Sequence, residues 1–81
     1  MPSMPHEAVF RITTVHAPRI YRALLPELSD EVNPRSVTTC TLLSDTVLEL
    51  HVAAHDLPAL RAALNMVLRL ISVADEVQDL L

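Results

Sequence analysis

The chain contains no glycine, no lysine and no tryptophan among its 81 residues, and Cys40 is its single cysteine. Without glycine there is no P-loop and no Gly-x-x-Gly loop that could clamp a nucleic-acid backbone. One cysteine excludes an intrachain disulfide and a multi-cysteine metal site, and nothing indicates an oxidising compartment. These absences remove several common routes to phosphate binding and metal coordination.

Positive charge is scarce, because six scattered arginines stand against ten acidic residues and the formal net charge is −4. Affinity for a polyanion grows with the number of phosphates that basic side chains neutralise, so we expect no tight nucleic-acid binding from this chain alone. Arg11 and Arg35 are the candidate nucleic-acid contacts within a larger assembly, although local pairing is the simpler explanation of each.

Long apolar runs are also missing. No run approaches the roughly 20 residues that a transmembrane helix needs, and residues 1–6 lack the features of a signal peptide. We therefore expect no membrane contact and a cytoplasmic location. The chain is expected to form one domain over residues 1–81, with residues 1–5 disordered. A domain of this size buries only about 60% of its unfolded surface, so association with another copy or a larger protein is the expected source of further stability.

Hydrophobic periodicity predicts a strand, a helix and a loop in the first half of the chain. Alternating side chains predict the strand over Glu7–Val15. The helix begins at Ala17-Pro18 and ends near Leu25, because Pro26 disfavours helical geometry at the residue before it. The acidic segment Glu27–Pro34 has the composition of a loop.

Two strands and a long helix are predicted in the second half. The β-rich runs Arg35–Leu43 and Thr46–Ala54 flank Ser44-Asp45, which predicts a hairpin turn. Asp56 is a suitable N-cap for a helix that extends to Leu80. The predicted fold is an α+β two-layer domain of β-α-β-β-α order, with a three-stranded antiparallel sheet and two helices on one face.

The long helix has more apolar surface than one core can cover, since a surface helix needs an apolar stripe only a little over ~100° wide. One apolar face comprises Leu57, Leu60, Leu64, Val67, Leu68 and Ile71. A second comprises Met66, Leu70, Val73 and Val77, and a narrow polar stripe carries Arg61, Asn65, Arg69, Ser72, Glu76 and Asp79. We interpret the second face as the surface for a partner, although the sequence leaves open which face points inward.

The residue types that usually carry chemistry do not form a convincing constellation. His51 and His55 are four residues apart, but they straddle the end of a strand, so the spacing does not bring them together as it would on a helix. Cys40 lies in mid-strand without an argued cationic neighbour that would activate its thiol. The sequence therefore predicts no catalytic residue, no metal site, no cofactor and no enzymatic activity of the chain itself.

Several segments together resemble a known family. These are Pro34-Arg35-Ser36, Leu48-Glu49-Leu50, Asp56-Leu57 and the helix with Leu60-Arg61-Ala62-Ala63-Leu64-Asn65 and Leu68-Arg69. The combination closely resembles the small Pcc-type subunit of the KEOPS complex over nearly the whole chain. The helical segment directly after an aspartate is the most specific part of the resemblance.

The resemblance implies a role in making threonylcarbamoyladenosine on tRNA, in archaea and eukaryotes. In that family the chemistry belongs to a metal-dependent transferase subunit, assisted by a kinase and a tRNA-binding subunit. The small subunit is a non-catalytic scaffold that forms a homodimer and docks its helices on the transferase. It would contact tRNA only within the assembly.

Six residues are the candidate partner interface, namely Leu24, Asn65, Met66, Arg69, Leu70 and Val73. One alternative is a free-standing RNA-binding module of KH-like topology, which predicts salt-dependent tRNA binding by the isolated chain. A ligand-sensing regulatory domain is a further alternative, suggested only by the generic α+β outline.

Overall fold

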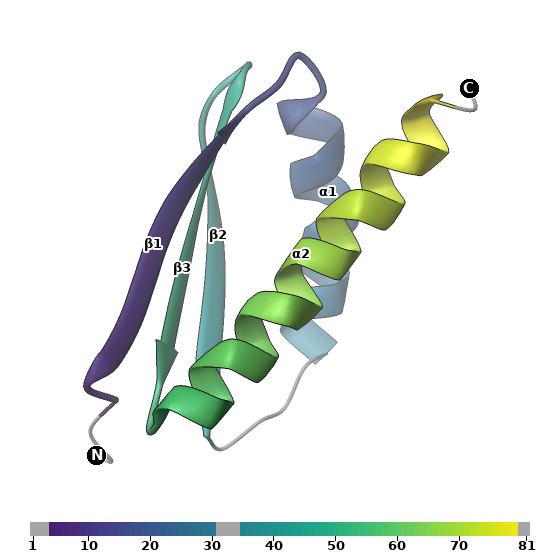
Figure 1. Cartoon of the computed structure of the whole chain (residues 1–81). Coiled ribbons are helices and arrows are strands. Elements are labelled where there is room, and N and C mark those ends of the chain that lie inside the picture. Colours follow the sequence, from purple (N-terminus) through teal and green to yellow (C-terminus); the bar gives the residue numbers. More distant parts are fainter. Residues whose placement is uncertain (1–3, 31–34, 80–81) are drawn as a thin grey trace.

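The computed structural model describes residues 4–30 and 35–79, and side chains within 4–28 and 35–73. Its elements are β1 His6–Thr13, α1 Ala17–Asp30, β2 Ser36–Ser44, β3 Val47–Ala54 and α2 Leu57–Asp79. The β-α-β-β-α order and the α+β fold are confirmed, with both helices on one face of the sheet (Figure 1). The expected disorder of residues 1–5 concerns residues 1–3, which lie outside the described residues, and Met4-Pro5, which have no regular structure.

The strand that is last in sequence lies at the centre of the sheet. The strand order is β1-β3-β2, and β3 pairs antiparallel with both neighbours. Its alternate residues Leu48, Leu50, Val52 and Ala54 are fully buried beneath the helices. Its side chains alternate between the two sides of the sheet, which separates a covered inner face from an outer face.

The core consists of the inner face of β3 and a few side chains of the two helices. Ile20 and Leu24 of α1 and Val67 of α2 are each at most 1% exposed and pack with the β3 residues. Phe10 and Ile12 of β1 contribute partly buried side chains to the same cluster. In the described parts of the chain, neither helix is long and apolar enough to cross a bilayer.

Helix α1 is longer than the sequence predicted. It continues through Pro26 to Asp30, so the predicted end near Leu25 and the first part of the predicted loop are wrong. Pro26 removes one N–H donor, which an uninterrupted helix would direct at the carbonyl of Arg22. Both residues are exposed. Water can therefore satisfy that carbonyl, which makes the proline tolerable here. Residues 31–34 of the predicted loop lie outside the described residues.

The strand ends also differ from the predictions by one or two residues. Strand β1 ends at Thr13 rather than Val15, and the turn between β2 and β3 is at Asp45-Thr46 rather than Ser44-Asp45. The pairing shifts register between Leu42 and Ser44, which accommodates one extra residue in β2. Ser44 pairs with Val47, so Asp45-Thr46 is a two-residue turn without glycine, and the irregularity lies beside it in β2.

Candidate interaction surfaces

The buried side chains of α2 are two alanines and a valine, whereas Leu60, Leu64 and Leu70 pack against the core only partly buried. Ala59, Ala63 and Val67, spaced four residues apart, are the buried side chains of the helix within residues 57–73. A stripe of alanine lets the helix axis approach the strands closely. Val67 was predicted on the first apolar face of the helix, whereas Ala59 and Ala63 were not among the residues predicted on either apolar face.

The expected division of α2 into two apolar faces is therefore wrong in part. Leu57 and Leu68, predicted on the same apolar face as Val67, are 58% and 53% exposed. Met66 and Leu70, assigned to the partner face, are partly buried and pack against the core. Val73 is 52% exposed, as a surface residue would be.

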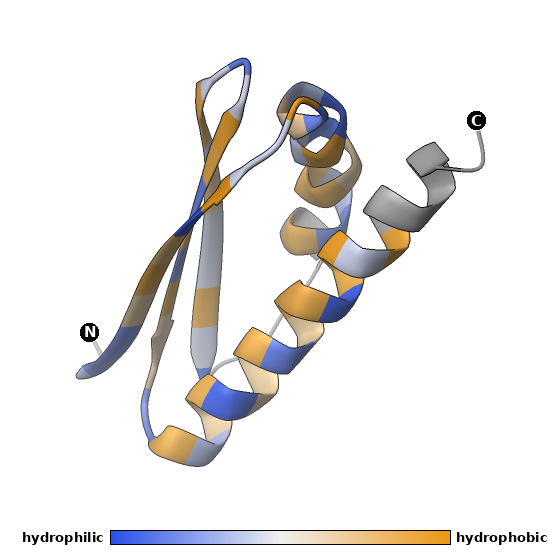
Figure 2. Ribbon diagram, turned by 45° about the horizontal axis from the view of Figure 1, so that its top comes forward, coloured by the Kyte–Doolittle hydropathy of each residue, from blue (hydrophilic) through white to orange (hydrophobic). Residues whose placement is uncertain are grey.

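The exposed side of α2 forms a continuous strip, which we call the α2 ridge. It comprises Leu57, Arg61, Asn65, Leu68, Arg69, Ser72 and Val73, all of them exposed. Hydrophobic and hydrophilic bands alternate along α2 in Figure 2. The ridge thus combines half-exposed aliphatic side chains with polar groups on one helix surface.

The six candidate interface residues fall into three groups. Asn65, Arg69 and Val73 lie on the α2 ridge. Met66 and Leu70 lie at its margin, half-buried against the core. Leu24 is 1% exposed inside the core, so its side chain has almost no surface to offer a partner. The exposed residues Leu57, Arg61 and Leu68 were not among the six.

A second surface is the outer face of the sheet, opposite the helices (Figure 1). We call this the outer sheet face, and it comprises Glu7, Val9, Arg11, Val37, Thr39, Thr41, Val47, Glu49, His51 and Ala53. Val9 and Val37 are 60% and 52% exposed on the two outer strands. Apolar side chains therefore also lie open on this side of the domain.

The charged groups of the outer sheet face are paired within the chain. Arg11 Nε donates to Glu49 Oε2 at 3.1 Å, directly across β1 and β3. His51 Nε2 lies 2.9 Å from Glu7 Oε1, also between these two strands. Cross-strand pairs of this kind fix side chains in place on a sheet surface. The face therefore carries two cross-strand contacts, one between Arg11 and Glu49 and one between His51 and Glu7.

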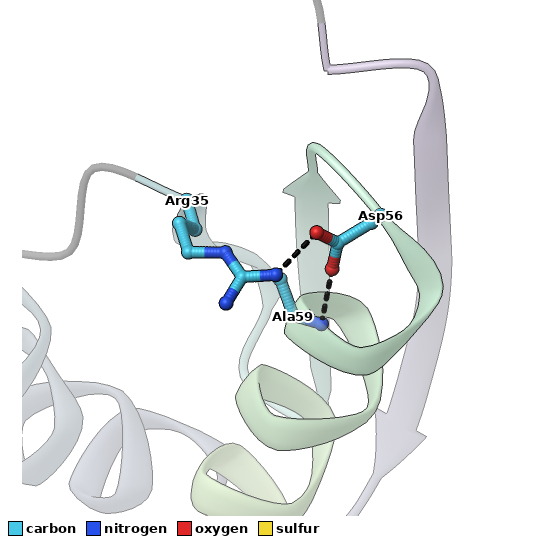
Figure 3. A network of polar contacts seen from close by, with 3 residues as sticks. All are labelled: Arg35, Asp56 and Ala59. Atoms are coloured by element: carbon cyan, nitrogen blue, oxygen red, sulfur yellow. Dashed lines mark hydrogen bonds and ion pairs between the residues drawn. The ribbon is translucent and has the colours of Figure 1, made fainter.

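A polar network joins the start of α2 to the residue before β2 (Figure 3). The Ala59 N–H donates to Asp56 Oδ1 at 2.8 Å, which confirms Asp56 as the N-cap. The guanidinium of Arg35 donates to the other carboxylate oxygen. The Ala59 hydrogen bond, followed by that of Arg35, lowers the pKa of Asp56. A main-chain bond from the His55 N–H to the Arg35 carbonyl, 3.0 Å long, closes the same junction.

The candidate nucleic-acid residues are thus both engaged by carboxylates of the chain itself. Arg11 contacts Glu49 and Arg35 contacts Asp56. Cys40 is half-buried, and burial raises the pKa of its thiol, which opposes a nucleophilic role. Within residues 4–30 and 35–79 there is no group of three or more His, Cys, Asp or Glu side chains that could hold a metal ion.

The fold and its two open faces define a small α+β domain suited to protein contacts. A family model described as "Transcription factor Pcc1" matches residues 6–79, and the chain belongs to this family. Pcc1 is a family of KEOPS subunits, and membership associates the chain with that complex and with tRNA processing. A comparison with curated proteins gave no match.

Proposed function

We propose that this chain is a non-catalytic scaffold subunit of the KEOPS complex, which pairs with a second copy of itself and docks the transferase subunit that acts on tRNA. Membership of the Pcc1 family supports an accessory role in that complex. The observation that carries the docking proposal is the exposure of Leu68 and Val73 on α2, whose opposite side is already buried on the sheet. An amphipathic helix of a partner would cover such side chains.

The energetic gain from covering the α2 ridge is substantial for so small a domain. Full burial of a valine or leucine side chain is worth about 1.5–3 kcal/mol. Leu57, Leu68 and Val73 are each just over half exposed, so a partner would remove the remaining half of each from water. Each of the three then adds about 1 kcal/mol of favourable transfer free energy.

The outer sheet face suits the second copy. Two copies related by a two-fold axis meet through the same surface, so that surface must complement itself. The outer sheet face carries the Arg11–Glu49 ion pair and the His51–Glu7 contact side by side, with Val9 and Val37 beside them. A dimer through this face would leave the helices of both copies open, so that the dimer joins two transferase subunits.

The kinase and tRNA-binding subunits would be reached through the transferase. The internal carboxylate contacts of Arg11 and Arg35 give no support to an autonomous RNA-binding module. In this proposal the scaffold supplies no catalytic residue, and its contribution is to hold two catalytic assemblies together. Contact with tRNA would arise only within the assembled complex.

The absolute mass of this chain mixed with the transferase subunit of the same organism, measured by light scattering, tests the proposal. We expect a two-to-two assembly for the unchanged chain. Leu68→Asp should release the transferase and leave a dimer of this chain, because it introduces a charge on the ridge. The double variant Val9→Asp, Val37→Asp should instead leave a one-to-one complex.

Each variant is the control for the other, since the two changes lie on opposite faces of the same domain. Circular dichroism of the isolated variants should show the helical content of the unchanged chain. A mixture that elutes as separate components contradicts docking, and an unchanged two-to-two mass for either variant contradicts the surface assigned to that contact. Salt-dependent tRNA binding by the isolated chain would instead favour the RNA-binding alternative.

A further inference from the structure

A single histidine lies near the middle of the outer sheet face. His51 is on the central strand β3, in register with Val9 of β1 and Thr39 of β2. Its side chain is 42% exposed, and both helices cover the other side of the sheet (Figure 1). A second copy of the chain that covers the outer sheet face would therefore cover this histidine as well.

The His51 ring can keep its contact with a carboxylate in both of its protonation states. Its Nε2 lies 2.9 Å from Glu7 Oε1. An ionised carboxylate only accepts hydrogen bonds, so Nε2 carries the hydrogen whether the ring is neutral or positively charged. A second proton, taken up at Nδ1, therefore changes the charge of the face and leaves the hydrogen bond to Glu7 in place.

The net charge of the outer sheet face depends on this histidine. The structure describes β1, β2 and β3 over their whole lengths, and the ionisable side chains that they place on this face are Glu7, Arg11, Glu49 and His51. His6 lies on the helix side, in register with the buried Ala54. With neutral His51, one arginine stands against two glutamates, which leaves a net charge of −1. With protonated His51, the charges of the face balance.

Charged groups at the two ends of the sheet are distant from His51 or paired with each other. Asp45 is in the β2–β3 turn, six residues before His51, which is about 20 Å along an extended strand. At the other end, Arg35 and Asp56 form an ion pair, and His55 is four residues from His51, or about 13 Å. These separations exceed the screening length of about 8 Å at physiological ionic strength.

We propose that protonation of His51 strengthens the pairing of this chain with a second copy, so that acidity favours the dimer. This inference rests on the dimer through the outer sheet face proposed above and adds its regulation. A two-fold axis brings identical faces together, so two faces of the same net charge repel each other, whereas two balanced faces do not. Exclusion of water between the copies increases this difference.

The direction of the pH dependence follows from this repulsion. Because the pairing of two faces is easier when both histidines are protonated, the dimer binds more protons than two separate chains do. Its stability is therefore present at low pH and is lost as the pH rises through the range in which histidine releases its proton, about pH 5 to 8. Glutamates stay ionised over this range, since their ordinary pKa is about 4.3.

Sedimentation equilibrium of the complete chain at about pH 5.5 and about pH 8, in roughly 150 mM NaCl, tests this inference. We expect the dimer dissociation constant to be about 10-fold lower at the acidic pH, since each of the two histidines contributes about 3-fold. His51→Gln keeps a polar side chain that cannot be protonated. Its dimer should be about as weak at both pH values as that of the unchanged chain at the alkaline pH.

Glu7→Gln gives the sharpest test, because it should reverse the pH dependence. Without the Glu7 charge, the face is balanced when His51 is neutral and positive when His51 is protonated. The dimer of this variant should therefore be tighter at the alkaline pH than at the acidic pH. His6→Gln is the matched control, since it removes a histidine from the opposite side of the same sheet, and it should keep the response of the unchanged chain.

The outcomes separate this inference from the dimer on which it rests. If the unchanged chain is monomeric at both pH values, the proposed dimer falls and the inference falls with it. If a dimer forms with equal dissociation constants at both pH values, the dimer stands and the inference is wrong. A pH response that survives in His51→Gln, or that keeps its direction in Glu7→Gln, comes from other groups and overturns the inference.

Discussion

The outer sheet face and the α2 ridge differ in the polar contacts that their side chains make within the chain. On the outer sheet face, Arg11 contacts Glu49 and His51 contacts Glu7, so both carboxylates already have a partner within the chain. On the α2 ridge, Leu57, Leu68 and Val73 are each just over half exposed among polar side chains. A face whose polar groups are paired within the chain suits a second copy of itself, whereas a helix surface with open aliphatic side chains suits an amphipathic partner.

The largest effect on the free energy of unfolding is expected for a core leucine of the helices, and it is compared here with that for a leucine of the α2 ridge. Leu24→Ala should destabilise the domain by about 2–5 kcal/mol, because it empties a packed site. Leu68→Ala should change the free energy of unfolding by only about 0.5 kcal/mol, because its side chain is half exposed already. Urea unfolding of both variants measures the difference. Equal losses would mean that Leu68 belongs to the core and that the α2 ridge is defined wrongly.

An intermediate effect on stability is expected at the junction of Arg35 and Asp56. Here the carboxylate caps α2 and is not part of either outer face. Asp56→Ala should lower the melting temperature more than Asp56→Asn, since asparagine retains N-cap ability. The bonds from Ala59 and Arg35 hold the pKa of Asp56 below its ordinary value of 3.8. The stability they contribute is therefore present above that value and is lost as the pH falls through the lowered pKa of the folded state.

Thermal unfolding measured from pH 6 down to pH values below the lowered pKa of Asp56 would reveal this contribution. We expect Asp56→Asn to lose less stability on acidification than the unchanged chain does. Parallel curves for the two proteins would show that Asp56 is not ionised more readily in the folded state, contrary to the network in Figure 3.

The smallest effect is expected on the outer sheet face. Arg11 is well exposed, and exposed ion pairs are worth about 0.2–1 kcal/mol. A double-mutant cycle with Arg11→Ala and Glu49→Ala should give a coupling energy in that range for the monomer at low concentration. The same cycle measured on the dimer should give a larger value, because burial in the interface reduces screening by water. An equal coupling in both states would place the dimer contact elsewhere.

Much of this architecture could be predicted from the sequence, because the local signals agree with the tertiary structure. The β-rich run Thr46–Ala54 predicted β3, and Asp56 was recognisable as an N-cap from its position before a helix. The inward side of α2 could not be predicted in the same way. Close approach of backbones favours Ala59 and Ala63 there, and no measure of hydrophobicity ranks alanine above the leucines beside it.

Contacts between residues that are far apart in the sequence could not be predicted either. Nothing in the local pattern pairs Arg11 with Glu49 or Arg35 with Asp56, because those pairs depend on strand register and on the path between α1 and β2. Leu24 was assigned to the partner interface for a related reason. Its apolar helical position is equally consistent with the core, and only the arrangement of both helices over one sheet decides between them.

The central position of β3 has a consequence for synthesis of the protein. β2 and β3 are joined by a short turn, so their hairpin can form as soon as residue 54 is available. β1 has no such neighbour, because its Thr13 pairs with Val47, 34 positions later in the chain. Contacts between distant segments form more slowly than local ones. On the ribosome, β1 therefore emerges well before β3, the strand that completes its hydrogen bonds. During this interval the polar backbone groups of β1 are unpaired, and chaperones can bind the nascent chain.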